Sequence, residues 1–194
     1  MSMRDERRRV LREVARRAVS TIGNRPTVER LEQAKGHFQE LGNRRDLFPD
    51  DEFPSPSGSE TERTFLVFDD EQGTALYAVN SVPGMSYRPH DHGGSWALIV
   101  AIAGQEKHYF YDRDPDKPGA LIRKGELICE PGRAVSLAPE GIHSIEGVGD
   151  TPLFHLHLYG KRFEDQTERI EYDLESGQTV TFRVQNVGII EDRR

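Results

Sequence analysis

The stretch Gly84-Met-Ser-Tyr-Arg-Pro-His90-Asp-His92-Gly-Gly-Ser-Trp-Ala97 contains two histidines that lie two residues apart. In a β-strand, residues i and i+2 point to the same face, so a strand here would hold both imidazoles side by side. Neutral imidazole is a ligand for zinc, copper, iron and nickel. The stretch therefore predicts half of a metal site. His143, in Pro139-Glu-Gly-Ile-His143, is the best candidate for the other half.

Around this stretch, the chain from Thr64 onward has the pattern of a β protein. Short apolar or β-branched segments alternate with glycine and proline turns. About ten such segments in a row are typical of a sandwich or barrel. We expect strands at 64–69, 74–82, 96–103, 106–112, 126–130, 134–138, 143–146, 153–159, 169–173 and 179–184, with loops at 113–125 and 160–168.

The N-terminal part has a different pattern. Apolar residues recur at helical spacing over 3–21 and again over 27–41, where Val28, Leu31, Ala34, Phe38 and Leu41 would form the buried stripe. A polar, proline-rich connection follows over 43–62, and its phenylalanines 48 and 53 could attach it to the domain. We therefore expect residues 1–62 to be helices and a linker packed on a barrel formed by residues 63–194.

Composition excludes some functions. The net charge is -7, whereas a nucleic-acid-binding domain needs a basic face. The one cysteine allows no intrachain disulfide, which fits a reducing cytoplasm. No secretory signal and no segment long enough to span a membrane is visible. We expect a cytoplasmic protein that binds neither nucleic acid nor membrane, as a monomer or a small homo-oligomer.

The spacing Gly84-x5-His90-x-His92-x4-Ala97-x6-Gly104, followed by Pro139-Glu-Gly-Ile-His143, resembles the two sequence motifs of the cupin superfamily. Cupins are small barrels built as a double-stranded β-helix, or jelly roll. Most of them carry a metal-binding glutamate at the position of Ala97. The resemblance implies an all-β barrel of this type, with the N-terminal helices packed on it.

Three histidines without the glutamate resemble the thiol dioxygenases, the cupins that include cysteine dioxygenase and 3-mercaptopropionate dioxygenase. Phe154-His155-Leu-His157-Leu-Tyr159 is similar to their Ser-x-His-x-Tyr strand. The resemblance implies that His157 and Tyr159 are catalytic residues beside the metal, while His155 replaces the family serine. The cofactor that it implies is Fe(II), held by His90, His92 and His143.

The substrates that this resemblance implies are O2 and a small thiol with a carboxylate, either cysteine or 3-mercaptopropionate, and the product is the sulfinate. In this family an arginine near the early strands binds the carboxylate. Arg63 lies in the corresponding region, and Arg88, beside the metal motif, is its rival. His155 and Arg63 are therefore the predicted substrate-binding residues, although either arginine could equally be a surface charge.

Charge supports a thiol substrate independently. Three neutral imidazoles leave a divalent metal its full positive charge, which favours an incoming thiolate. Three protein ligands also leave coordination positions open, as catalytic sites do. Three histidines also hold catalytic zinc, so iron follows from the resemblance alone. The alternatives are another metal-dependent cupin enzyme, such as an isomerase or a different dioxygenase, and a non-enzymatic barrel that binds a small acid.

Overall fold

Two helices begin the chain in the computed structural model, which describes residues 2–184 and 188–189. Ser2 and Asp5 form a capping box at the start of the first helix, and the Thr27 side chain caps the second. Each cap satisfies a backbone N–H that the helix itself leaves free. The predicted helices are confirmed, except that the second ends in a 3-10 turn. The bounds are α1 Met3–Ile22, α2 Val28–Gln39, η1 Glu40–Asn43 and η2 Arg45–Leu47.

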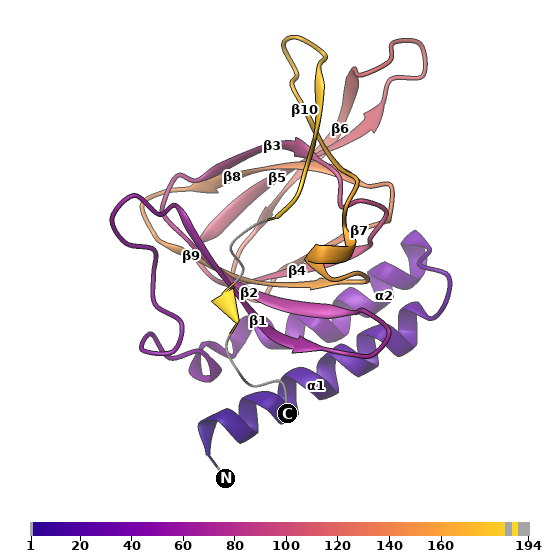
Figure 1. Cartoon of the computed structure of the whole chain (residues 1–194). Coiled ribbons are helices and arrows are strands. Elements are labelled where there is room, and N and C mark those ends of the chain that lie inside the picture. Colours follow the sequence, from indigo (N-terminus) through magenta and orange to yellow (C-terminus); the bar gives the residue numbers. More distant parts are fainter. Residues whose placement is uncertain (1, 185–187, 190–194) are drawn as a thin grey trace.

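The described residues form two six-stranded sheets that face each other (Figure 1). One has the order β12-β1-β2-β9-β4-β7 and the other β11-β10-β3-β8-β5-β6. Neighbouring strands are antiparallel, apart from the parallel pair β1 and β12. The bounds are β1 Glu62–Asp69, β2 Ala75–Ser81, β3 Ser86–His90, β4 Ala97–Ala103, β5 Gln105–Arg113, β6 Leu121–Cys129, β7 Ala134–Leu137, β8 Ile142–Val148, β9 Leu153–Tyr159, β10 Arg169–Tyr172, β11 Thr179–Phe182 and β12 Gly188–Ile189.

This topology confirms the predicted jelly-roll barrel with N-terminal helices. The chain crosses between the sheets after β2, β3, β4, β6, β7, β8, β9 and β11, so strands that are far apart in sequence become neighbours. Residues 185–187 and 190–194 of the predicted barrel region lie outside the described residues. Among the residues that are described, no helix combines the length and the apolar character needed to cross a membrane.

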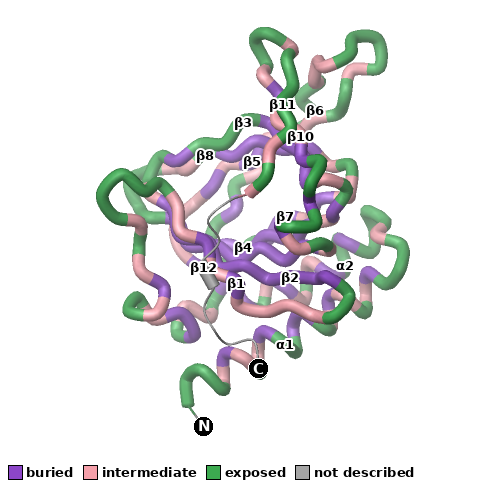
Figure 2. Tube along the Cα trace, in the orientation of Figure 1, coloured by how far each residue is buried: buried purple, intermediate pink, exposed green. Residues whose placement is uncertain are grey.

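Two strands differ from the sequence-based prediction. The segment 113–125, predicted as a loop, contains the first half of β6, which pairs with β5 in a hairpin that extends beyond the barrel (Figure 2). Both faces of this part are exposed or half-buried, so it lacks the apolar alternation that marks a strand. β3 was not among the strands expected from the sequence. It contains Pro89, which the structure accommodates at a register shift between Tyr87 and His90.

Two apolar clusters lie on opposite faces of the first sheet. The outer cluster joins both helices to the side chains that β2, β4 and β9 direct away from the barrel, such as Leu76, Leu98 and Leu156. The inner cluster, which includes Tyr77, Ile99 and Tyr159, fills the barrel interior. Because successive strand residues point to opposite faces, these strands are buried on both sides. The helices are therefore part of the core.

Phenylalanines of the proline-rich linker complete the outer cluster. Phe48 and Phe53 are fully buried, and their ring centroids lie 5.2 Å apart. The Phe53 ring also contacts Phe65 of β1 and Phe154 of β9 edge to face. The predicted anchoring of the linker by these rings is confirmed. Val28, predicted to be buried, is 66% exposed because the first turn of α2 lies beyond the sheet it covers.

Replacing Phe53 with alanine should lower the free energy of unfolding by about 3–5 kcal/mol, because it empties a buried aromatic site. Val28→Ala is the matched control, with an expected change within about 0.5 kcal/mol. Urea denaturation followed by circular dichroism measures both. Equal midpoints for the two variants would show that the linker contributes nothing to the core.

Candidate metal centre

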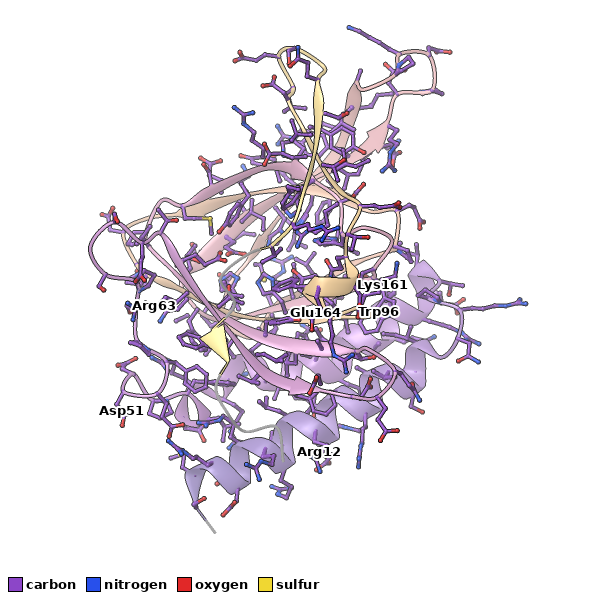
Figure 3. All side chains as sticks on the ribbon, in the orientation of Figure 1. Arg12, Asp51, Arg63, Trp96, Lys161 and Glu164 are labelled. Atoms are coloured by element: carbon purple, nitrogen blue, oxygen red, sulfur yellow. The ribbon has the colours of Figure 1, made fainter. Side chains whose placement is uncertain are left out.

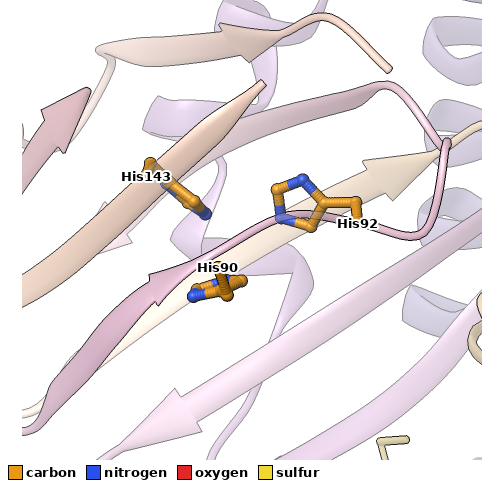
Figure 4. Close-up of side chains that lie close together, drawn as sticks. All are labelled: His90, His92 and His143. Carbon is orange, nitrogen blue, oxygen red and sulfur yellow. The ribbon is translucent and has the colours of Figure 1, made fainter. Parts of the chain in front are cut away.

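Three histidines meet inside the barrel. His90 is the last residue of β3, His92 follows it in a loop, and His143 lies on β8. Antiparallel pairing of β3 with β8 places His90 directly opposite His143. The three side chains are buried, and one ring nitrogen from each lies within 4.8 Å of those of the other two (Figure 4). The predicted convergence is confirmed, although the strand ends at His90 and does not continue through His92.

The loop that carries His92 is held by Asp91. The Asp91 backbone N–H donates to the carbonyl of Ile170 at 3.0 Å, and the Asp91 carboxylate accepts the backbone N–H of Ile170 at 3.0 Å. The carboxylate also accepts from Gly93 and from Arg113. Gly93 has a φ of 57°, and a Cβ there would lie 3.3 Å from the backbone of Gln166. Residues from β10 and the segment before it therefore position a histidine about 80 residues earlier in the sequence.

The three imidazoles are neutral and present free lone pairs. Burial lowers the pKa of His90 to about 3, and it also holds the pKa values of His92 and His143 below the ordinary range. His90 Nδ1 lies 2.8 Å from the carbonyl oxygen of Arg88, to which it donates, so Nε2 keeps its lone pair. Nε2 of His143 and both nitrogens of His92 are buried without a hydrogen-bond partner.

This donor set fits a divalent transition metal. Buried imidazole nitrogens without partners are costly, and a metal ion would satisfy them. No carboxylate belongs to the group among the residues that the structure describes. Ala97 is fully buried in the inner cluster. Three neutral ligands would leave the full charge of a divalent ion in the site, together with open coordination positions.

Tyr159 and His157 of β9 lie beside the three histidines. The two side chains point into the barrel from the same face of the strand, and the Tyr159 hydroxyl is 3.0 Å from Nδ1 of His157. The ring centroids of Tyr159 and His92 are 5.4 Å apart. Burial raises the pKa of Tyr159 above its ordinary value and lowers the pKa of His157 to about 3, so the pair carries no charge at neutral pH.

A cavity of about 260 Å³ opens onto this group. His90, His143, His157 and Tyr159 line it. Four charged residues also belong to the lining: Glu62 of β1, Arg169 and Glu171 of β10, and Arg183. Of these four, Arg169 is the buried one. The volume suits a ligand of a few non-hydrogen atoms. The cavity therefore combines two of the three potential metal ligands, a phenol, and charged groups of both signs.

Arg169 is one of the cations in the cavity wall. Its side chain is buried, and Nε donates to the backbone carbonyl of Asp91 at 3.3 Å. The guanidinium lies 4.9 Å from the ring centroid of Phe182. Among the described residues, the hydrogen bond of the Arg169 guanidinium is this one, made through Nε. Its two terminal nitrogens are therefore available to a bound anion.

Glu62 is one of the carboxylates in the cavity wall. Its oxygens accept from the hydroxyls of Thr64 at 3.0 Å, Ser81 at 3.4 Å and Tyr87. These hydroxyls hold the carboxylate in place without neutralising its charge. Glu62 is therefore a held anionic group in the cavity wall, and Arg169 is a buried cationic one.

The structure does not bring the other predicted substrate residues into the cavity. Arg63 neighbours Glu62 on β1 and so points to the opposite face, where its guanidinium contacts Glu60 and Ser57 (Figure 3). Arg88 pairs with Asp173 on the surface. His155 faces the interior but contacts Glu106, away from the cavity lining. The assignment of Arg63 as the carboxylate partner is therefore corrected, because strand alternation turns it outward.

Sequence reasoning missed Arg169 and Glu62. Both occupy strand positions with no distinctive local pattern, and they reach the cavity because β1 and β10 lie on opposite sheets of the barrel. His108 and Glu106 were also missed as interior residues, although alternation along β5 gave a signal. The polar residues at 106 and 108 share a face with Phe110, as the histidines of β9 share a face with Tyr159.

No protein-family model and no curated protein sequence matches the chain. Among solved structures, it is similar to oxalate oxidase in complex with the substrate analogue glycolate (15% identity, TM-score 0.45, 59% of this chain and 59% of that one). It is also similar to a cupin domain from Schizosaccharomyces pombe (10% identity, TM-score 0.44, 58% and 74%). A third similar chain comes from the structures of the DMSP lyases RdDddP and RnDddQII (20% identity, TM-score 0.35, 44% and 37%). The chain thus spans little more than a third of that lyase chain, and at these TM-scores the functional argument comes from the site alone.

Acid should destabilise the metal-free protein between pH 6.5 and 3. The folded-state pKa of His157 is about 3, below the value of 6.5 expected when unfolded, so the unfolded chain binds more protons in that window. Lowering the pH from 7 to 5 should therefore remove about 2 kcal/mol of unfolding free energy for this one histidine. Urea denaturation at both pH values checks this, and His157→Gln should lose about 2 kcal/mol less than the parent. An equal loss in the two proteins would contradict it.

Proposed function

We propose that the chain is a non-haem iron(II) thiol dioxygenase that converts a small thiol and O2 into a sulfinate. The observation that supports this most is a buried centre of three neutral histidines without a carboxylate, facing a small cavity. Such a centre keeps the full charge of a divalent ion and attracts a thiolate. His90, His92 and His143 would hold the ion.

The overall reaction needs no further reductant. Both atoms of O2 are added to the thiolate sulfur, which loses four electrons, and O2 gains the same four. Iron(II), when bound at the three imidazoles, supplies the redox chemistry and the open coordination positions for this oxidation. The protein's contribution is to orient the thiol, exclude water and place one proton donor beside the reacting sulfur.

Tyr159 is that proton donor. Its raised pKa keeps the phenol protonated, and a hydrogen bond donated by Nδ1–H of His157 to the phenol oxygen would leave the hydroxyl proton free for the substrate. Because His157 is neutral, it adds no charge beside the metal centre. The pair therefore offers a neutral, oriented hydrogen-bond donor that can stabilise negative charge on the added oxygen atoms.

Charge complementarity favours cysteine over 3-mercaptopropionate. Either acid could place its carboxylate against the terminal nitrogens of Arg169. Cysteine also carries an ammonium group, and Glu62 supplies an anionic partner whose other contacts are hydroxyls. A substrate with both charges would use both groups of the cavity wall.

An anaerobic, iron-loaded preparation tests the function. Cysteine, 3-mercaptopropionate and cysteamine are offered with O2, and oxygen uptake is compared with sulfinate formation. We expect one sulfinate for each O2 with at least one thiol. Loading with zinc is the control and should abolish oxygen uptake. Tight iron binding with no oxygen uptake for any thiol would reject the proposal and favour a binding barrel.

Tyr159→Phe should retain iron and lose turnover by about 100-fold, because it removes a proton donor but no metal ligand. His143→Ala is the contrasting variant, since it deletes a ligand and should lose the iron itself. Iron content and sulfinate formation are measured on the same preparations. Parent-like turnover with full coupling to O2 in Tyr159→Phe would show that this hydroxyl has no role.

Two charge variants should change substrate preference in opposite ways. Arg169→Gln should raise KM about 10- to 100-fold for cysteine and 3-mercaptopropionate but not for cysteamine, which has no carboxylate. Glu62→Gln should raise KM for cysteine and cysteamine but not for 3-mercaptopropionate. The unaffected thiol in each variant is the internal control for folding. A uniform effect on all three thiols would contradict the assignment of these groups.

A further inference from the structure

A second set of buried polar side chains lies behind the three-histidine centre. His108 and Glu106 of β5 and His155 of β9 are fully or almost fully buried. Nδ1 of His108 is 3.0 Å from Nδ1 of His143. On its other side, Nε2 of His108 lies 3.2 Å from Oε2 of Glu106, and Nδ1 of His155 lies 2.7 Å from the same oxygen. The centre is thereby connected to a buried carboxylate.

Glu106 is an anion without a lysine or arginine partner among the described residues. Burial by itself would raise its pKa, but the neighbouring imidazoles of His155 and His108 lower it below the ordinary range. In both contacts an imidazole nitrogen lies close to the carboxylate oxygen, but the N–H direction does not point at that oxygen. The contacts therefore act through electrostatic attraction more than as linear hydrogen bonds. Burying a carboxylate in this position costs desolvation free energy unless neighbouring groups stabilise its charge.

We propose that Glu106 is a positioning residue of the metal centre, acting through His108 on the ligand His143. The inference rests on the three-histidine centre and not on the thiol substrate. It concerns which ring nitrogen carries the proton, a choice between two neutral tautomers of each imidazole.

The carboxylate sets the tautomer of His108. A neutral imidazole has one N–H, and the negative charge 3.2 Å from Nε2 favours the proton on that nitrogen. Nδ1 of His108 is then left with a lone pair. Two facing nitrogens share a hydrogen bond only when one of them carries a proton, so Nδ1 of His143 must be the donor.

This arrangement prepares His143 to bind a metal. With its proton on Nδ1, His143 keeps the lone pair of Nε2, the nitrogen that is buried without a partner. If His108 carried its proton on Nδ1 instead, His143 would have to accept there and would carry a proton on Nε2, which blocks coordination. The backbone carbonyl of Arg88 fixes the tautomer of His90. The tautomer of His143 instead depends on Glu106, which reaches it through His108.

The test uses metal-free and zinc-loaded protein, not turnover. Long-range 1H–15N correlation spectra of the metal-free protein report which nitrogen of His143 is protonated. We expect Nδ1–H in the parent and a substantial Nε2–H population in Glu106→Gln. Competition with a chelator should show zinc affinity weakened about 10- to 100-fold in this variant. Glu126→Gln, an exposed carboxylate on the neighbouring strand β6, is the matched control and should change neither readout.

A second variant shows whether Glu106 acts through His108. His108→Phe removes the acceptor for His143 and should weaken zinc binding by itself, so it also serves if Glu106→Gln fails to fold. Adding Glu106→Gln to His108→Phe should then cause no further loss. An unchanged His143 tautomer with parent-like zinc affinity in Glu106→Gln would overturn the proposal. Fully additive losses in the double variant would overturn it as well.

Discussion

The packing of the N-terminal helices and linker against the first sheet is the interaction on which the rest of the structure depends, because it lets β9 bury both of its faces. All seven residues of β9 are buried. Phe154, Leu156 and Leu158 belong to the cluster that includes both helices and the linker phenylalanines. The other face is then free to carry polar side chains into the barrel. Without the helices, the apolar face would be exposed to water, and the strand would lose the burial that fixes its register.

A polar barrel interior imposes a second constraint. Burial penalises charge, so the pKa values of His90 and His157 fall to about 3, and both rings are neutral beside the cavity. Neutral imidazole is also the form that binds a metal. The same desolvation that stabilises the neutral rings therefore prepares the centre. The charged groups Glu106, Glu62 and Arg169 are each held in place by contacts with neighbouring residues.

In the proposed function, the distribution of those charges would separate holding an ion from binding a substrate. Glu106 lies behind the centre and reaches it through His108, whereas Glu62 and Arg169 face the cavity. A carboxylate in direct contact with the ion would lower its charge and compete with a thiolate. Keeping the carboxylates outside the ligand set leaves the ion attractive to an anionic ligand, while each carboxylate still acts on a neighbouring side chain or on the substrate.

The sequence by itself determined the β-rich class of the barrel, both helices and the closeness of His90 to His92, since each depends on local spacing. His143 was identified as the third histidine by the resemblance of its motif, and the pairing of β3 with β8 brings it to the other two. Helical periodicity identified α1 and α2, and alternation along 153–159 assigned His157 and Tyr159 to one face of a strand. Only the tertiary structure decided which charges meet the centre. Arg63 and Glu62 are adjacent in sequence, yet the pleat of β1 sends one to the surface and the other to the cavity. Arg169 enters because β10 pairs with β3, and His108 meets His143 because β5 pairs with β8. Partners separated by dozens of residues are chosen by strand pairing, which a local pattern does not encode.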